Sequence, residues 1–171
     1  MSPSSKKKNK PIGTYVWASE GAQPLAASTI SADAPSGPSY GASAGLSFKD
    51  TGTLIRQLKC GLPMTAFDDL QGAMAVPAKT LASAANIAVR TLNRRRKEGR
   101  LQTDESERLF RIAVLYDRAI EVLGDQERAR AWFKEPKKAL GMKTPLQYAD
   151  TEPGAREVEN LLGRLEYGVF S

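Results

Sequence analysis

Residues 77–97, PAKTLASAANIAVRTLNRRRK, decide the fold of this 171-residue chain because they fit two short helices joined by a tight turn. The first helix supplies apolar contacts through Leu81, Ala82 and Ala85, and a small Ala side chain lets two helices cross closely. Asn86 falls in the turn, where a residue that tolerates a positive φ is favoured. Ile87 and Leu92 then face the core. The pattern predicts a helix-turn-helix unit whose second helix keeps an exposed face.

The exposed face of the second helix has the chemistry of a DNA-binding surface. Asn side chains pair with adenine and Arg side chains with guanine in the major groove, and other Lys and Arg side chains contact phosphates. The predicted DNA-binding residues are Asn86, Val89, Arg90, Asn93, Arg94, Arg96, Lys97 and Arg100. Arg95 would also lie along the phosphate path, although this position is usually apolar in such motifs. The alternative is a basic face that only contacts solvent.

The basic charge of the chain is concentrated in the same segment. The formal net charge is +6, and residues 86–100 carry six basic side chains against one acidic, whereas residues 101–171 carry eleven basic against thirteen acidic. Such a concentration of positive charge is typical of a phosphate-binding surface. The sequence therefore joins one phosphate-binding segment to a mildly acidic C-terminal half.

The residue types that several kinds of site require are scarce in this sequence. It has no histidine, and Cys60 is its one cysteine. This composition excludes a disulfide framework, leaves few ligands for zinc and provides no imidazole for acid–base catalysis. We expect Cys60 to be a small buried hydrophobic residue. We also expect no catalytic residue, no metal site and no cofactor, in a cytoplasmic protein without a membrane-spanning segment.

Helical periodicity continues beyond the helix-turn-helix unit, and no stretch of strand length alternates between apolar and polar residues. One long helix is expected from an N-cap at Thr103 or Asp104 to Gly124. Shorter helices follow up to the C-terminus. The predicted fold class is all-α, with a helix-turn-helix domain at residues 49–101 and a small helical domain at residues 102–171.

Residues 1–48 are rich in Ser, Ala, Gly and Pro and have no sustained apolar period. They offer too little apolar surface to offset the entropy of ordering, so we expect a mobile basic tail. Four Lys side chains between residues 6 and 10 favour a solubilising tail over an arm on the DNA backbone. Local docking of Tyr15, Val16 and Trp17 is a further alternative.

Three features of the C-terminal half are typical of a protein–protein contact. Trp132 lies in a short helix between prolines, Arg164 lies among apolar neighbours, and the segment from Tyr167 to Ser171 has no polar tail. Trp, Tyr and Arg are enriched at interface hot spots. For Trp132 a packing role inside the protein is favoured, whereas for the terminal segment contact with a partner is favoured.

Several short motifs in this half carry a resemblance to a known family. They are Trp132 with Pro136, Leu140-Gly141, Thr144-Pro145-Leu146, Gly154, Leu162-Gly163-Arg164 and Glu166-Tyr167-Gly168-Val169. These motifs resemble the C-terminal toxin-binding domain of the Xre/MbcA/ParS antitoxins. The resemblance extends more loosely over residues 50–171, including the helix-turn-helix region.

The resemblance implies an antitoxin of a type II toxin–antitoxin system, with no catalytic activity of its own. Such a protein binds and inhibits a RES-domain toxin that degrades NAD, and it represses its own operon by binding operator DNA. We expect a homodimer within a toxin–antitoxin hetero-oligomer. The expected toxin-binding residues are Trp132, Glu159, Arg164, Tyr167, Gly168, Val169, Phe170 and Ser171. The alternatives are a stand-alone transcriptional regulator whose C-terminal domain only dimerises, and a nucleic-acid-binding accessory module of an enzyme.

Overall fold

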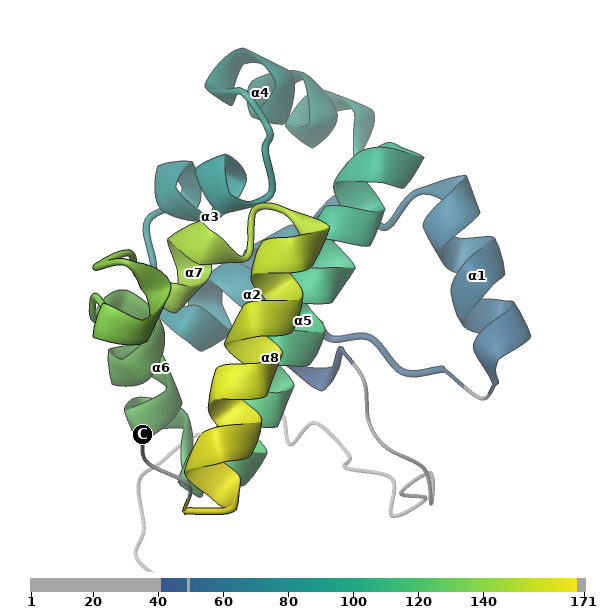
Figure 1. Ribbon diagram of the computed structural model, residues 1–171. Helices are drawn as coiled ribbons and strands as arrows, with labels where there is room; N and C mark the ends of the chain where they lie inside the picture. Colours follow the sequence, from purple (N-terminus) through teal and green to yellow (C-terminus); the bar gives the residue numbers. More distant parts are fainter. Residues whose placement is uncertain (1–40, 49, 169–171) are drawn as a thin grey trace, which may run out of the picture. The chain divides into compact units, whose positions relative to one another are not determined.

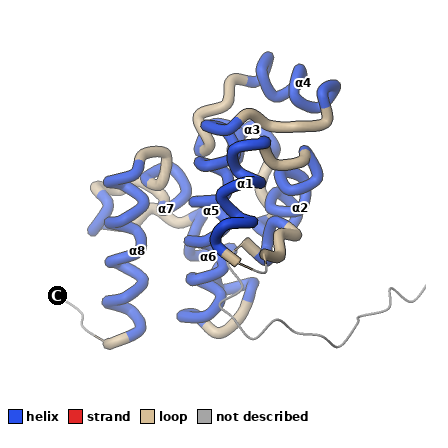
Figure 2. Tube along the Cα trace, turned by 90° about the vertical axis from the view of Figure 1, so that its right-hand side faces the viewer, coloured by secondary structure: helices blue, strands red, loops and turns tan. Residues whose placement is uncertain are grey.

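The computed structural model describes residues 41–48 and 50–168. Within these residues it contains eight α-helices and two short 3₁₀-helices joined by loops, with no β-strand (Figures 1 and 2). The predicted all-α fold class is therefore confirmed. No helix in this part of the chain is long and apolar enough to cross a membrane. Tyr15, Val16 and Trp17, the Lys-rich stretch near residues 6–10 and the last residues, 169–171, lie outside the described residues.

The helix-turn-helix half contains three consecutive helices that build the motif and its support, namely α2 (Met64–Met74), α3 (Ala78–Ala84) and α4 (Val89–Glu98). Asn86, between α3 and α4, has a φ of 55°, which is the left-handed conformation predicted for the turn. The predicted core positions of the motif are all buried, namely Leu81, Ala82, Ala85, Ile87 and Leu92. Gly99 ends α4 in the left-handed conformation. The predicted motif is thus present, and α3 and α4 are its two helices.

The longest helix, α5 (Thr103–Leu123), is the central helix of the described fold and contacts α1, α2, α6 and α8 (Figure 1). Its N-cap is Gln102, one residue before the earlier of the two predicted caps. The Gln102 N–H donates to Glu105 Oε2 at 2.8 Å, and the Gln102 carbonyl already accepts from the Ser106 N–H. Gly124 ends α5 as predicted.

The C-terminal half consists of α6 (Gln126–Lys134), the 3₁₀-helix η2 (Lys138–Leu140), α7 (Pro145–Tyr148) and α8 (Glu152–Glu166). Helix α8 packs along α5 (Figure 1). Gly154 lies where α8 meets α7, and a Cβ atom at this position would come within 1.9 Å of the Tyr148 carbonyl oxygen. The two helices therefore touch backbone to backbone at this glycine.

Residues 41–48 differ from the mobile tail that their composition predicts. They include the 3₁₀-helix η1 (Ala42–Ala44), and both Ala44 and Leu46 are buried. The Asp117 carboxylate accepts hydrogen bonds from the Gly41 N–H at 2.8 Å and from the Ser43 N–H at 3.1 Å. Two apolar side chains are too few to give a sequence period, and the anchoring carboxylate is more than seventy residues away. The sequence of this segment therefore gives no local sign of order.

Helix α1 (Thr51–Cys60) buries no side chain fully. Leu54 and Leu58 are half-buried, and Ile55 is 46% exposed. The prediction that Cys60 is buried is wrong, because this residue ends a helix that lies at the surface, and its side chain is exposed.

Candidate functional site

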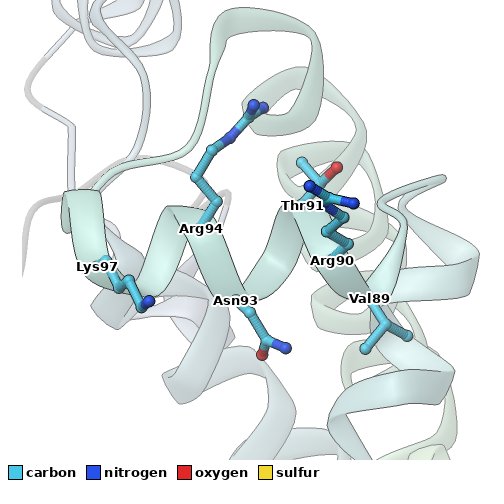
Figure 3. Close-up of a pocket in the computed structure, with 6 residues that line it drawn as sticks. All are labelled: Val89, Arg90, Thr91, Asn93, Arg94 and Lys97. Atoms are coloured by element: carbon cyan, nitrogen blue, oxygen red, sulfur yellow. The ribbon is translucent and has the colours of Figure 1, made fainter.

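The outward face of α4 brings together five of the predicted DNA-binding residues. A surface pocket of about 780 Å³ is lined by Val89, Arg90, Thr91, Asn93, Arg94 and Lys97 (Figure 3). Val89 and Asn93, four residues apart, point to the same side of the helix, and Arg94 points to the other (Figure 3). Val89 is half exposed although it is apolar. This face therefore offers an amide, three cations and one apolar side chain, and no acidic residue lines the pocket.

The other three predicted DNA-binding residues lie around this face. Asn86 is exposed in the turn that precedes α4. Arg96 forms an ion pair with Asp68 of α2, with 3.3 Å between Nη2 and Oδ1. Arg100 donates from Nη1 to the Cys60 carbonyl oxygen at 3.2 Å. The structure thus does not bring Arg96 and Arg100 into the α4 pocket.

Arg95 does not lie along a phosphate path as predicted, because its side chain is buried and only 4% exposed. Its Nε atom donates to Glu105 Oε2 at 2.7 Å, and its Nη1 atom donates to Glu98 Oε2 at 2.6 Å. Both hydrogen bonds raise the pKa of the guanidinium. Arg95 therefore joins α4 to the start of α5, which explains why a charged residue occupies a usually apolar position.

Glu105 is the acidic partner in this pair and also caps α5. Burial alone raises the pKa of its carboxyl group, but the hydrogen bonds from Arg95 and from the Gln102 N–H outweigh it, so that the pKa is lowered overall. Ser106, the next residue, is fully buried and accepts from the Leu62 N–H at 2.8 Å. The Arg95–Glu105 pair thus links α4 to α5, and Ser106 links α5 to the segment between α1 and α2.

Three of the expected toxin-binding residues line a common pocket on α8. The pocket, of about 660 Å³, is lined by Arg118, Glu157, Glu159, Asn160, Gly163, Arg164, Glu166 and Tyr167. Arg164 forms an ion pair with Glu157, with 3.1 Å between Nη2 and Oε1. Tyr167 is 79% exposed and follows directly on α8, and Gly168 comes next with a φ of 65°. Val169, Phe170 and Ser171 lie outside the described residues.

Trp132 does not share this pocket. It is 9% exposed and packs edge-on against Phe133, with 5.4 Å between the ring centroids. The Lys137 Nζ atom lies 5.5 Å from the centroid of the Trp132 ring. This environment favours the packing role for Trp132.

Two groups that sequence reasoning missed connect the sites to the rest of the fold. Arg118 of α5 pairs with Glu121 on the same helix and with Glu166 at the end of α8. At the C-terminal end of α2, the Ala73 carbonyl oxygen accepts hydrogen bonds from Tyr116 Oη, Gln126 Nε2 and Arg130 Nε. A backbone acceptor leaves no signal in a sequence, so no pattern could have identified this second group. In the described ranges, no cluster of three or more His, Cys, Asp or Glu side chains could hold a metal ion.

Comparisons with known proteins match both halves of the chain to one family. Residues 43–114 match the antitoxin Xre-like helix-turn-helix domain, and residues 118–168 match the antitoxin Xre/MbcA/ParS C-terminal toxin-binding domain. The antitoxin Xre of Yersinia enterocolitica is 38% identical over 120 residues, which are 69% of this chain and 81% of that protein. The antitoxin Xre of Photorhabdus laumondii is 37% identical over 113 residues, which are 65% of this chain and 76% of that protein.

A more distant relative carries a different description. The Prs ADP-ribosylating antitoxin of a Sphingobium species is 24% identical over 127 residues, which are 68% of this chain and 80% of that protein.

The two domain matches follow one another along the sequence. The match to the helix-turn-helix domain contains the α4 face, and the match to the C-terminal toxin-binding domain contains the α8 pocket. The chain therefore belongs to the Xre/MbcA/ParS family of antitoxins.

Proposed function

We propose that this antitoxin inhibits a RES-domain toxin that degrades NAD, as part of a type II module, and that as a homodimer in the cytoplasm it represses its own operon. In this proposal residues 49–101 bind operator DNA and residues 102–171 bind the toxin. The observation that carries it is the presence of two separate surface pockets that differ in charge, one on each domain. The α4 pocket is lined by three basic residues and no acidic one, whereas the α8 pocket is lined by three acidic and two basic residues.

The α4 face supports the DNA-binding part of the proposal. Asn93 and Arg94 have the side chains that form bidentate contacts with adenine and guanine, and Val89 can contact a thymine methyl group. Arg90 and Lys97 add positive charge on the same helix. The second helix of a helix-turn-helix unit places such side chains in the major groove.

The charge reversal Arg90→Glu/Arg94→Glu tests this part. We expect the double variant to lose binding to the DNA upstream of its own gene while still neutralising the toxin. Arg128→Glu is the control, because Arg128 is an exposed arginine in the first turn of α6. The 21-residue helix α5 separates α6 from α4 along the chain. Wild-type affinity should fall steeply with salt concentration. Unchanged binding by the double variant would refute a DNA-binding role for α4.

The α8 pocket supports the toxin-binding part. NAD carries a pyrophosphate, so a cleft that binds it needs positive charge, and residues 150–171 carry five acidic against two basic side chains. Tyr167 is a highly exposed aromatic residue that lines the α8 pocket. Aromatic residues of this kind are typical anchors of protein interfaces. In the proposal, Tyr167 to Ser171 cover the NAD-binding cleft of the toxin.

Tyr167→Ala tests this contact without disturbing the core, because the side chain is almost fully exposed. We expect the variant to melt at the wild-type temperature but to protect cellular NAD poorly when it is co-expressed with the toxin. Met142→Ala is the control, since Met142 is also an exposed apolar residue, at 64%, and does not line the α8 pocket. Deletion of residues 169–171 extends the test. Full protection of NAD by both the point variant and the deletion would end the cleft-covering proposal.

The Sphingobium relative favours a second form of the toxin's chemistry. The name of that protein refers to ADP-ribosylation of Prs. ADP-ribosylation uses NAD as the donor, so a toxin of either kind needs a cleft for the same cofactor. Measurement of free nicotinamide together with ADP-ribosylated protein in toxin-expressing cells separates NAD degradation from protein modification.

A further inference from the structure

A polar pocket of about 540 Å³ lies between the first helix of the helix-turn-helix motif and a helix of the toxin-binding half. Helix α3 supplies Lys79, Thr80, Ser83 and Ala84, and the segment around α7 supplies Lys143, Leu146, Gln147 and Asp150. The two lysines, the two hydroxyl groups and Gln147 are exposed. Hydrogen-bond donors from both halves of the protein therefore face one surface pocket.

The two lysines of this pocket are not neutralised within the described chain. The twelve ion pairs among the described residues include neither Lys79 nor Lys143. The Lys143 Nζ atom lies 5.9 Å from the centroid of the Tyr148 ring. Gln147 is exposed and uses its Oε1 atom to accept from the Thr144 N–H, so this bond does not use its Nε2 donors. Such a set of Lys, Ser, Thr and Gln donors is typical of contacts to DNA phosphates.

The position of α3 indicates which ligand passes this pocket. In a helix-turn-helix complex the second helix enters the major groove and the first helix crosses the DNA backbone. Here α3 is the first helix, and α7 packs directly against it (Figure 1). A DNA strand whose backbone phosphates contact Lys79 and Thr80 therefore also passes next to Lys143.

We propose that Lys143, together with Lys79, binds the phosphate backbone of the operator, so that the toxin-binding domain forms part of the DNA-binding surface. This inference rests on the proposed DNA binding by α4. It extends the surface in contact with DNA from one domain to two. Asp150, on the same pocket, opposes the contact, because its carboxylate repels phosphate.

Salt-dependent DNA binding by the full chain measures the contact directly. The probes are a duplex from the region upstream of the gene and a duplex of random sequence, each titrated at several salt concentrations. Removing one phosphate contact should lower the magnitude of the slope of log K against log[salt] by about 0.9, so we expect this change for Lys143→Ala and about twice this change for Lys79→Ala/Lys143→Ala. Both duplexes should lose affinity alike, since phosphate contacts carry no sequence information.

Two further variants make the test specific to this pocket. Asp150→Asn should strengthen binding to both duplexes, because it removes a negative charge beside the phosphate path. Arg128→Ala removes one exposed positive charge far from α4 and should leave the slope unchanged.

Two results together would overturn the inference while the proposed function stands. Lys143→Ala would leave the slope of log K against log[salt] unchanged, and Arg90→Glu/Arg94→Glu would abolish DNA binding. Binding that survives Arg90→Glu/Arg94→Glu would instead refute the proposed function. Loss of toxin neutralisation by Lys143→Ala, with DNA binding intact, would assign the pocket to the protein partner and would also overturn the inference.

Discussion

The buried pair of Arg95 and Glu105 makes a quantitative prediction for the variant Arg95→Met. Methionine keeps the length of the side chain but removes the positive charge that faces Glu105 at 2.7 Å. Breaking a buried ion pair from one side costs about 3–5 kcal/mol, because a charge is left buried without its partner. Glu105 keeps its hydrogen bond from the Gln102 N–H, so we expect a loss near the lower end, about 3 kcal/mol. In a protein of this size, that loss lowers the melting temperature by about 6–12 °C.

The pH dependence of this loss has a definite sign. In the wild type the pKa of Glu105 lies below its ordinary value of 4.5, so its stabilising effect is present above pH 4.5 and disappears as the pH falls through the folded-state pKa. In Arg95→Met, burial is no longer opposed by Arg95, and we expect the pKa to rise above 4.5. The ionised carboxyl group then destabilises the folded variant at neutral pH. The stability difference between the two proteins should therefore be larger at pH 7 than at pH 4.

Urea unfolding followed by circular dichroism at 222 nm gives these free energies. The double variant Arg95→Met/Glu105→Gln is the control, because it leaves no buried charge and Gln still accepts from the Gln102 N–H. We expect it to recover most of the loss. A loss below about 1 kcal/mol in Arg95→Met, or an equal loss in the double variant, would refute the role assigned to this pair.

Three further predictions concern other parts of the fold. Gly154→Ala should lower the free energy of unfolding by about 1–3 kcal/mol in thermal unfolding, because the new Cβ atom clashes with the Tyr148 carbonyl oxygen. Gly163→Ala on the same helix is the control. Its new Cβ atom has no neighbour within 4 Å, so this variant should be neutral or slightly stabilising. Deleting residues 1–40 should leave the melting temperature nearly unchanged, and deleting residues 1–48 should lower it, because only the longer deletion removes the buried Ala44 and Leu46. Tyr116→Phe should cost about 1 kcal/mol in urea unfolding, since it removes the hydroxyl that donates to the Ala73 carbonyl oxygen. An equal effect of the two glycine variants, or of the two deletions, would contradict the packing described here.

Much of the fold could be predicted because its signals are local. The φ of Asn86 and the helix end at Gly124 depend on residues within one turn of the chain. Apolar periodicity likewise identified the core positions of the helix-turn-helix motif. These features follow from neighbouring residues, so a single sequence contains them.

The errors arise where the structure depends on distant partners. Arg95 has a basic side chain in a basic segment, and only the fold brings it to Glu105. Residues 41–48 are held by Asp117, and no pattern within the segment indicates this. The same reasoning applies to the candidate sites. The structure brings Glu159, Arg164 and Tyr167 to one pocket and places Trp132 elsewhere, but the DNA-binding and toxin-binding roles of these residues stay predictions.

The three donors on the Ala73 carbonyl oxygen have a consequence for the exchange of domains between relatives. Tyr116, Gln126 and Arg130 all come from α5 and α6, whereas the acceptor belongs to the backbone at the end of α2. To these three hydrogen bonds the helix-turn-helix half contributes only a backbone carbonyl group in the last turn of α2, where the carbonyl groups of an α-helix lack a partner within the helix. A chimaera that takes its C-terminal half from another family member should therefore keep this contact with α2 when the donor protein supplies equivalent side chains at these three positions. At this one contact, recombination between relatives needs no matching change of a side chain on α2.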